Sequence, residues 1–410
     1  MNDAPSRNPE ACATIATFVA KVPRRILILR PDHLGDLILF SGALRHIRKR
    51  WPEAHITLCV RSYGMKLFAN CPYIDRLQPY EPFIPLGRIN WPLWMPGRWA
   101  QALFTAIAPS WSYDLAILPL AAPWVNHHRI LQWLPARERI GICGNTENQT
   151  ARDELRHRGS YSSQMDSTML SWNSSELETN RLFLEFLGIS TTRDEVWPEF
   201  WTQPVDRESA EKLLGTPKKH RLGIAPGVMS PPGKGLPVGW YIGALSRAGF
   251  EGMEIVLFGG GNDAAICAGI AEGLKQAGNQ FEVLNLAGKT TVLQLVECIR
   301  ACDLFLCPDA APLHIATALR KPVVGVMGGG HFGRFYPWGD PALSRVVNKP
   351  MECYGCNWEC KYETVRCVQE IPPADAAREL RSLHARLQAE EQTSGARLRA
   401  DRIGKLIQKK

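Results

Sequence analysis

The feature that most constrains this chain is an alternation of short apolar runs with amphipathic segments, which occurs twice. The first apolar run, Arg25-Ile-Leu-Ile-Leu-Arg30, is continuous, as expected of a strand buried on both faces of a parallel sheet. A polar turn, a helix predicted over Leu37–Trp51 and a strand at His55–Val60 follow it. Because parallel strands need a crossover connection between them, this order predicts a doubly wound α/β sheet.

A second series of the same kind begins near residue 206. Its strands are predicted at Leu222–Ala225, Glu254–Phe258, Val283–Leu286, Asp303–Cys307 and Pro322–Met327. Two further strands, Leu115–Leu120 and Arg139–Cys143, belong to the first series. A chain of 410 residues is long enough for two such domains. We therefore expect one domain at 1–205, a second at 206–372, and a C-terminal helix with a basic tail at 373–410.

Three segments depart from the alternation. Ala11–Ala20 is apolar but has the wrong flanks for a signal peptide, and it reads as a short amphipathic helix leading into the first strand. Residues 80–111 combine four tryptophans with five prolines, which forbids a continuous helix. This segment is either an irregular loop packed on the domain or an aromatic surface for a sugar or lipid acceptor or the membrane interface. Residues 144–175 are polar, with little periodicity, and we expect a mobile loop there.

The net charge of +8 is concentrated at one end of the chain. Residues 396–410 hold six basic residues and one acid, so the rest of the sequence is nearly balanced. No basic stripe or nucleic-acid motif appears outside the tail, so we expect no nucleic-acid partner. The tail is either a solvated end or a peripheral contact with an anionic inner membrane. Cysteine usage without a secretion signal indicates a cytoplasmic protein.

Three loops of the second series carry residues suited to a diphosphate. In a doubly wound sheet, ligands bind beyond the carboxyl ends of the strands, where these loops fall. Backbone N–H groups at helix N-termini and a lysine can together hold phosphate oxygens. The loops contain Pro226, Gly227 and Lys234, then Gly259 and Gly260, and then Asp309, Ala310, Ala311 and His314.

Several motifs occur in a fixed order over residues 25–385. They are Ile26-Leu-Ile-Leu-Arg-Pro-Asp-His-Leu-Gly-Asp-Leu37, Ser41-Gly-Ala-Leu-Arg45, Pro226-Gly227, Lys234-Gly-Leu-Pro237, Leu257-Phe-Gly-Gly260, Pro308-Asp-Ala-Ala-Pro-Leu-His314, Lys321-Pro-Val-Val-Gly325, and the stretch from Gly328 to Cys367. In these motifs the chain resembles glycosyltransferase family 9, the heptosyltransferases of lipopolysaccharide synthesis.

The resemblance implies a GT-B fold, in which two Rossmann-like domains face a central cleft. The first domain would hold a glycan or lipid-linked acceptor and the second a nucleotide-sugar donor, ADP-heptose in this family. Transfer would invert the anomeric centre, without a catalytic metal, in lipopolysaccharide core synthesis. Protein or other-glycan O-heptosylation, a nucleotide-sugar epimerase and a catalytically impaired nucleotide-sugar-binding scaffold are the alternatives.

The resemblance also assigns roles to individual residues. Asp36 matches the family's catalytic base, which takes the proton of the attacking sugar hydroxyl, and Asp32 is the rival carboxylate in the same turn. Lys234 matches the lysine that contacts the donor phosphates and offsets charge on the departing diphosphate, although an ordinary loop lysine is the alternative.

The donor motif departs from the family pattern at two positions. Asp309 and His314 match an Asp-(Ser/Thr)-Gly-Pro-x-His element, but Ala310 and Ala311 replace Ser/Thr and Gly. This change removes a hydroxyl and adds a Cβ, which puts donor affinity or donor identity in question. His314 is equally consistent with a buried core residue.

A cysteine cluster near the end of the second domain has the spacing of a metal site. Its members are Cys353, Cys356, Cys360 and Cys367. Four thiolates at this spacing in a reducing compartment suit a structural Zn²⁺ or a single iron, with a disulfide pair or free thiols as alternatives.

Overall fold

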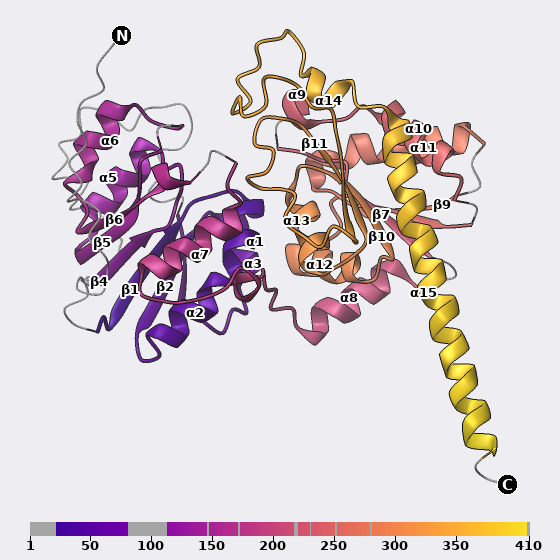
Figure 1. The fold of residues 1–410 in the computed structure, drawn as a ribbon, viewed down its shortest axis with the longest axis horizontal. Helices are drawn as coiled ribbons and strands as arrows, with labels where there is room; N and C mark the ends of the chain where they lie inside the picture. Colours follow the sequence, from indigo (N-terminus) through magenta and orange to yellow (C-terminus); the bar gives the residue numbers. More distant parts are fainter. Residues whose placement is uncertain are drawn as a thin grey trace. The chain divides into compact units, whose positions relative to one another are not determined.

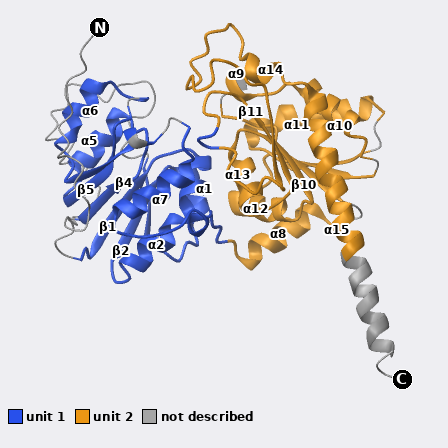
Figure 2. Cartoon of the chain, viewed as in Figure 1, with its two compact units in different colours: residues 1–201, 333–335 blue, residues 202–332, 336–410 orange. Residues whose placement is uncertain are grey.

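A computed structural model describes residues 22–80, 113–145, 147–170, 173–216, 220–229, 231–250, 252–278 and 281–407, with side chains up to 393 except at 169, 231 and 232. The expected helix at Ala11–Ala20 and the tryptophan-rich segment from 81 onward lie outside these residues. The chain divides into two compact units (Figure 2). Unit 1 comprises residues 1–201 and 333–335, and unit 2 comprises 202–332 and 336–410.

Unit 1 is built on a parallel sheet with helices between its strands (Figure 1). Within the described residues the strands are β1 (Arg25–Arg30), β2 (His55–Val60), β3 (Arg76–Pro79), β4 (Tyr113–Leu118), β5 (Ala136–Cys143) and β6 (Ser163–Asp166). The helices are α1 (Leu34–Ser41), α2 (Ala43–Arg50), α3 (Ser62–Phe68), α5 (Val125–Trp133), α6 (Ala151–Arg158) and α7 (Glu176–Phe186). The sheet order is β3-β2-β1-β4-β5-β6, and five of the six residues of β1 are buried, as a central strand requires.

Unit 2 repeats this construction. Its described strands are β7 (Arg221–Ile224), β8 (Glu254–Leu257), β9 (Glu282–Asn285), β10 (Leu304–Pro308), β11 (Val323–Met327) and β12 (Ser344–Asn348). Its helices are α8 (Pro204–Leu214), α9 (Pro231–Lys234), α10 (Val238–Ala248), α11 (Ala264–Gln276), α12 (Val292–Arg300), α13 (Ala311–Ala318), α14 (Arg366–Gln369) and α15 (Pro373–Ile407). The sheet order is β12-β11-β10-β7-β8-β9, with every pair parallel.

The two sheets share one topology. Numbered from its own first strand, each sheet has the order 3-2-1-4-5-6 of a Rossmann fold. The strand order reverses between β1 and β4 in unit 1 and between β7 and β10 in unit 2. Ligands of such sheets bind at the carboxyl ends of the strands beside this reversal, so the loops after these four strands are where a site is expected. The predicted fold class of two doubly wound Rossmann-like domains is thus confirmed.

One predicted helix is divided. The sequence predicts a single helix over Leu37–Trp51, whereas α1 ends at Ser41 and α2 begins at Ala43. Gly42 stands at the break, and a Cβ there would lie 2.2 Å from the carbonyl oxygen of Trp197. The glycine is therefore required by the close approach of another backbone segment.

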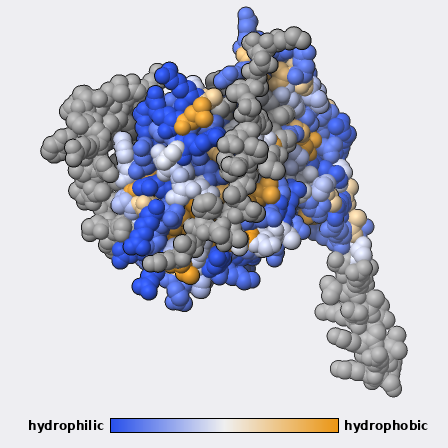
Figure 3. All heavy atoms as spheres, turned by 60° about the vertical axis from the view of Figure 1, so that its left-hand side comes forward, coloured by the Kyte–Doolittle hydropathy of each residue, from blue (hydrophilic) through white to orange (hydrophobic). Residues whose placement is uncertain are grey.

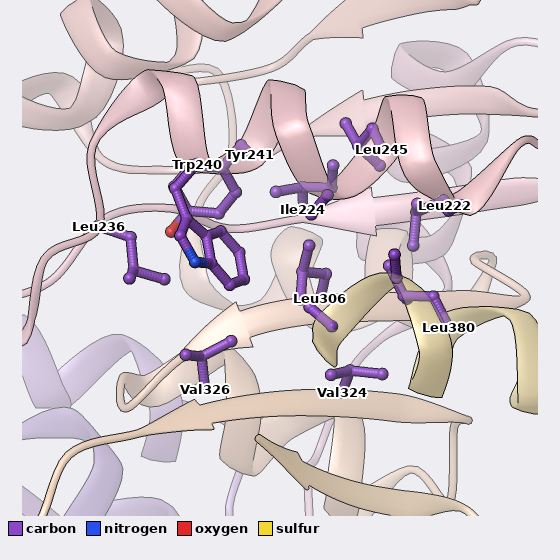
Figure 4. Close-up of a cluster of buried hydrophobic side chains, with 14 of the residues drawn as sticks. Leu222, Ile224, Leu236, Trp240, Tyr241, Leu245, Leu306, Val324, Val326 and Leu380 are labelled. Atoms are coloured by element: carbon purple, nitrogen blue, oxygen red, sulfur yellow. The ribbon is translucent and has the colours of Figure 1, made fainter. Parts of the chain in front are cut away.

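The C-terminal helix is part of unit 2 and not a separate appendage. α15 packs on α10, and Leu380 lies in one buried cluster with Leu306 and Val324 (Figure 4). The indole N–H of Trp240 donates to the carbonyl oxygen of Ile371, 2.7 Å away, just before the helix begins. The helix continues to Ile407, so it extends into the residues that were expected to form a basic tail.

Two other expectations differ from the structure. Residues 144–175 are not simply a loop, because they contain α6, whose N-cap Thr150 accepts a hydrogen bond from the Asp153 N–H, and the edge strand β6. The first domain was expected to end at residue 205, whereas the first continuous segment of unit 1 ends at Trp201. Residues 333–335 also belong to unit 1, and a single boundary in the sequence could not predict this.

On the face drawn in Figure 3, the described residues are mainly hydrophilic, with scattered apolar residues. The large exposed apolar side chains, such as Trp124, Leu155 and Val205, come from different elements. Within the described residues, no helix combines the length and apolar character that crossing a membrane requires.

Candidate functional site

The turn after β1 holds the predicted base, Asp36. Asp36 lies in the first turn of α1, where a negative charge interacts favourably with the helix dipole. The preceding turn is fixed from its other side by α3 and the residue before it. Arg61 Nε donates to the Pro31 carbonyl oxygen at 2.6 Å, and the Tyr63 hydroxyl donates to that of Asp32 at 2.8 Å. The carboxylate is therefore carried by a well-braced turn at the switch point of the sheet.

A buried arginine organises the acidic groups around this turn. Arg30, the last residue of β1, is fully buried, and its Nε lies 2.7 Å from Asp32 Oδ2. Its Nη2 lies 3.6 Å from Oε1 of Glu176, the first residue of α7, and its Nη1 donates to the Pro119 carbonyl oxygen just after β4. One guanidinium thus joins the loops on both sides of the switch point.

A second arginine reaches the cluster from a distant part of the sequence. Arg334, in the segment 333–335 that belongs to unit 1, pairs with Glu147 and lies 3.9 Å from Oε2 of Glu176. The backbone N–H of Glu176 donates to the carbonyl oxygen of Arg334 at 2.8 Å. Arg334 and Glu176 are therefore held to each other by both side chain and backbone.

Burial and neighbouring acidic groups together raise the pKa values of both aspartates. Burial raises the pKa of Asp32 to about 7, with Arg30 opposing and Asp36 adding to the rise. Burial also raises the pKa of Asp36, Glu176 adds to this effect, and Arg30, His33 and Arg334 oppose it. A carboxylate with a raised pKa is a better proton acceptor than an ordinary surface aspartate.

The two aspartates are not equivalent in their contacts. Asp32 is paired with Arg30, whereas within the described residues no ion pair engages the Asp36 carboxylate. Asp36 is accordingly the better candidate for taking a proton from a bound ligand.

Sequence reasoning missed Arg30, Glu147, Glu176 and Arg334 as members of this cluster. Arg30 could have been noticed because it is a charged residue at the end of the apolar run that forms β1. No local sequence pattern indicates Arg334, because it lies 298 residues after Asp36 in the chain.

In unit 2, the structure brings together Lys234 and Asp309. Lys234 ends α9 in the loop after β7, and Asp309 directly follows β10, so they come from the two strands that flank the switch point. Lys234 Nζ lies 2.6 Å from Asp309 Oδ2, and the Asp309 side chain is only 6% exposed. The ion pair places the ammonium group of Lys234 at the position where this fold binds ligands.

His314 is a core residue by its contacts. It is 3% exposed and stacks on Trp338, whose indole N–H donates to His314 Nδ1 at 3.1 Å. Burial lowers the pKa of His314 to about 4, so its ring is neutral near pH 7. Asp309 raises and Lys234 lowers this pKa, so His314 lies close enough to the pair to interact with both charges.

Ala310 and Ala311 are accommodated without strain. Ala310 is extended, with φ −149° and ψ 167°, and Ala311 is the first residue of α13. Neither position adopts the left-handed backbone that would demand glycine. The replacement therefore removes a hydroxyl but does not disturb the helix start.

The glycines of the other two loops surround an acidic residue. A Cβ at Gly227 would lie 2.3 Å from the carboxyl carbon of Asp263, and a Cβ at Gly259 would lie 2.6 Å from Asp263 Cβ. The Asp263 carboxylate accepts the Gly260 N–H at 2.8 Å. These glycines thus make room for Asp263, which the sequence did not single out. Pro226, beside them, is buried.

The four clustered cysteines are all free thiols in unit 2. Cys367 is buried and accepts the Gly329 N–H at 3.3 Å. Burial raises the pKa of Cys367, and Cys353, Cys356 and Cys360 act in the same direction. Over the ranges that the structure describes, no three His, Cys, Asp or Glu side chains form a group able to hold a metal ion.

Curated relatives of the chain are heptosyltransferases. It is 23% identical over 305 residues to lipooligosaccharide heptosyltransferase 2 of Haemophilus ducreyi, covering 73% of this chain and 81% of that protein. It is 25% identical over 313 residues to lipopolysaccharide heptosyltransferase 2 of Salmonella typhimurium, covering 74% and 82%.

Solved structures share the fold at low sequence identity. A family 9 glycosyltransferase from Veillonella parvula matches with a TM-score of 0.66 and 18% identity, covering 88% of this chain and 97% of that one. Escherichia coli heptosyltransferase WaaC with ADP-2-deoxy-2-fluoro heptose matches with a TM-score of 0.57 and 17% identity, covering 87% and 98%. The iron-containing heptosyltransferase TibC with ADP-D-beta-D-heptose matches with a TM-score of 0.52 and 13% identity, covering 90% and 77%.

The model of glycosyltransferase family 9 (heptosyltransferase) matches residues 155–363, just over half of the chain. This stretch includes Glu176, Lys234 and Asp309 and extends to the cysteine loop. With a fold that agrees over most of its length, the chain belongs to glycosyltransferase family 9, the heptosyltransferases, and is a glycosyltransferase.

Proposed function

We propose that this enzyme transfers heptose from ADP-heptose, with inversion, to a glycan acceptor of the lipopolysaccharide core. The observation that carries the proposal is the carboxylate of Asp36, at the switch point of unit 1, with a raised pKa and no ion pair among the described residues. The relatives' names support the heptosyl group and the type of acceptor. The bound ligands of the structural neighbours support an ADP-linked donor.

The proposed reaction transfers one proton to the enzyme and releases one leaving group, ADP. The acceptor hydroxyl loses its proton to an Asp36 carboxylate oxygen as its oxygen forms a bond to the anomeric carbon of heptose. The bond from that carbon to the diphosphate oxygen breaks on the opposite face, which inverts the configuration and releases ADP. Lys234 offsets the negative charge that develops on the diphosphate, while Asp309 orients its ammonium group.

A donor screen tests this proposal directly. The purified enzyme is incubated with a lipopolysaccharide-core acceptor and with ADP-heptose or common UDP- and GDP-sugars, and the acceptor is examined by mass spectrometry. We expect the mass of one heptose to be added from ADP-heptose alone. Exclusive use of a UDP- or GDP-sugar would overturn the heptosyl assignment.

The same assay separates the alternative functions. ADP-heptose that changes configuration without an acceptor would indicate an epimerase. Transfer to a protein hydroxyl or an unrelated glycan, but not to core oligosaccharide, would change the acceptor class. No transfer to any acceptor, with ADP still bound, would favour a catalytically impaired nucleotide-sugar-binding scaffold. The altered donor motif at Ala310 and Ala311 is consistent with that alternative.

Two parts of the proposal concern the C-terminal region. We propose a structural zinc or iron at the four cysteines, supported by their ligand-like spacing in the sequence. Elemental analysis of the purified protein beside a variant with Cys353 and Cys356 replaced by serine tests it, and equal metal content in both would reject it.

We also propose a cytoplasmic enzyme that contacts an anionic membrane through residues 396–410, supported by their charge. Deleting these residues should weaken binding to vesicles that contain phosphatidylglycerol and leave turnover of a soluble acceptor unchanged. Equal vesicle binding by the full chain and the truncated chain would reject this location.

A further inference from the structure

The loop that contains the four cysteines places an aromatic ring against Lys234. Trp358 lies between Cys356 and Cys360, and Lys234 Nζ is 4.7 Å from the centroid of its ring. An ammonium group within about 6 Å of an indole ring centre is attracted by the negative potential of the ring face. Lys234 therefore has two anionic or electron-rich neighbours, the Asp309 carboxylate at 2.6 Å and the Trp358 ring.

The glycine-rich segment after β11 makes room for this ring. A Cβ at Gly328 would lie 2.8 Å from Trp358 Cη2, and a Cβ at Gly330 would lie 2.5 Å from Trp358 Cδ2 and Cε2. Cβ contacts this short do not occur in proteins, so any other residue at these positions would displace the indole. Two of the three consecutive glycines thus serve the placement of Trp358.

The backbone beneath the ring is held in an unfavourable conformation. Asn357 and Trp358 have φ values of 49° and 63°, in the left-handed region that non-glycine residues rarely adopt. The Asn357 N–H donates to the Gly330 carbonyl oxygen at 3.2 Å, and the Gly355 N–H donates to that of Gly329 at 2.9 Å. These contacts tie the two loops together and offset the strain.

A histidine fixes the plane of the indole. The Trp358 Nε1–H donates to His331 Nδ1 at 3.3 Å, and His331 Nε2 lies 2.6 Å from Asn357 Oδ1. A neutral imidazole with its proton on Nε2 satisfies both contacts, since it accepts at one nitrogen and donates at the other. The ring face, and not its N–H edge, is consequently presented to Lys234.

We propose that Trp358 is a positioning residue for the donor diphosphate and acts through Lys234. The inference deepens the proposed function and rests on its assignment of Lys234 to the phosphates. A lysine ammonium has three N–H donors on a flexible stem, and holding it costs conformational entropy. Asp309 and the Trp358 ring already engage two of the three N–H groups of Lys234, which leaves the third free to donate to a phosphate oxygen. The cysteine-containing loop is then a support of the donor site.

A double-mutant cycle tests the inference through binding rather than turnover. Wild type, Trp358→Leu, Trp358→Phe, Lys234→Met and the Trp358→Leu/Lys234→Met double variant are titrated calorimetrically with ADP, UDP and GDP. Tyr362→Leu is the matched control, because Tyr362 is an aromatic residue of the same loop that contacts Lys361 and Arg366 instead. Thermal unfolding of each variant verifies that it is folded.

We expect Trp358→Leu to weaken binding of the preferred nucleotide about fivefold to tenfold, and Trp358→Phe, which keeps a ring face, by about threefold or less. Tyr362→Leu should bind as wild type does. In the Lys234→Met background, Trp358→Leu should cause no further loss, because its effect is transmitted by the lysine.

An equal loss from Trp358→Leu with and without Lys234 would overturn the inference, since the tryptophan would then act independently. Wild-type binding by folded Trp358→Leu would overturn it as well. If wild type prefers UDP or GDP, the donor assignment fails but the cycle on that nucleotide still decides the role of Trp358. If wild type binds none of the three, the inference falls together with the proposed function.

Discussion

The two switch points of this enzyme have the same topology and opposite chemistry. In unit 1, Asp32 and Asp36 follow β1 and lie with Glu176 of α7 around the buried Arg30. In unit 2, the loops beside β7 and β10 hold Lys234 against Asp309. The strand order decides where functional groups collect, and the residues on the loops decide whether that place gathers carboxylates or a lysine ammonium group.

The contrast extends to how each group is controlled. Asp36 is surrounded by charges of both signs that move its pKa in opposite directions. Lys234 is instead held in place by direct contacts with a carboxylate and a ring face. Unit 1 therefore tunes a protonation equilibrium, whereas unit 2 fixes the position of the Lys234 side chain.

The largest effect should come from removing the proposed base. Asp36→Asn is isosteric but cannot accept a proton, and we expect kcat for heptose transfer to fall by about a thousandfold. Asp32→Asn, which leaves Asp36 in place, should cost about tenfold or less. These values are measured by steady-state transfer to a core acceptor. A greater loss from Asp32→Asn would assign the base to the rival carboxylate.

The corresponding change in unit 2 should be smaller. Lys234→Met keeps the aliphatic stem and removes the charge, and we expect kcat to fall by about a hundredfold through loss of stabilisation of the departing diphosphate. Lys289→Met is the control, because Lys289 is an exposed lysine of unit 2 whose ammonium group donates to the Asn285 carbonyl oxygen. If both variants turn over like wild type, the electrostatic role of Lys234 is wrong.

Two single substitutions around Asp36 should shift the pH profile in opposite directions. Glu176 raises and Arg334 lowers the pKa of Asp36. A base works only when ionised, so activity is lost as pH falls through its pKa. Glu176→Gln should therefore move the acidic limb of kcat/KM to lower pH, and Arg334→Gln should move it to higher pH.

The same pair also has a stability consequence. Arg334→Gln removes the cationic side chain that Glu147 and Glu176 share, and we expect it to lower the free energy of unfolding by about 2 kcal/mol. Chemical denaturation measures this separately from the pH profile.

Shifts of the acidic limb in the same direction for both Glu176→Gln and Arg334→Gln would mean that Asp36 is not the group that titrates.

The smallest effect on activity is expected at His314. Since burial lowers its pKa to about 4, the ring carries no charge that a neutral substitute would remove at pH 7. We expect His314→Asn to lower the free energy of unfolding by about 1 kcal/mol, through the lost contact with Trp338, and to change the donor KM by about threefold or less. A rise in donor KM of about a hundredfold without loss of stability would make His314 a donor contact.

Much of the fold could be read from the sequence, because its determinants are local. Continuous apolar runs such as Ile26–Leu29 and Leu304–Cys307 are buried strands whatever surrounds them, and their alternation with helices implies a parallel doubly wound sheet. Asp36, Lys234 and Asp309 follow such strands directly, so their position at the carboxyl edge was also predictable. The strand β6 and the helix α6 were missed because their segment is short, polar and weakly periodic.

Only the tertiary structure decided which residues act together. Arg334 joins the Asp36 cluster, and Trp358 lies on Lys234, across separations of more than a hundred positions. Gly42, Gly227 and Gly330 are needed because a distant backbone or side chain approaches them. Electrostatic and packing forces depend on distance in space, and no local pattern encodes that distance. The sequence by itself therefore determined the two sheets and the ends of their strands, whereas the contacts that set a pKa or orient a cation came from the folded chain.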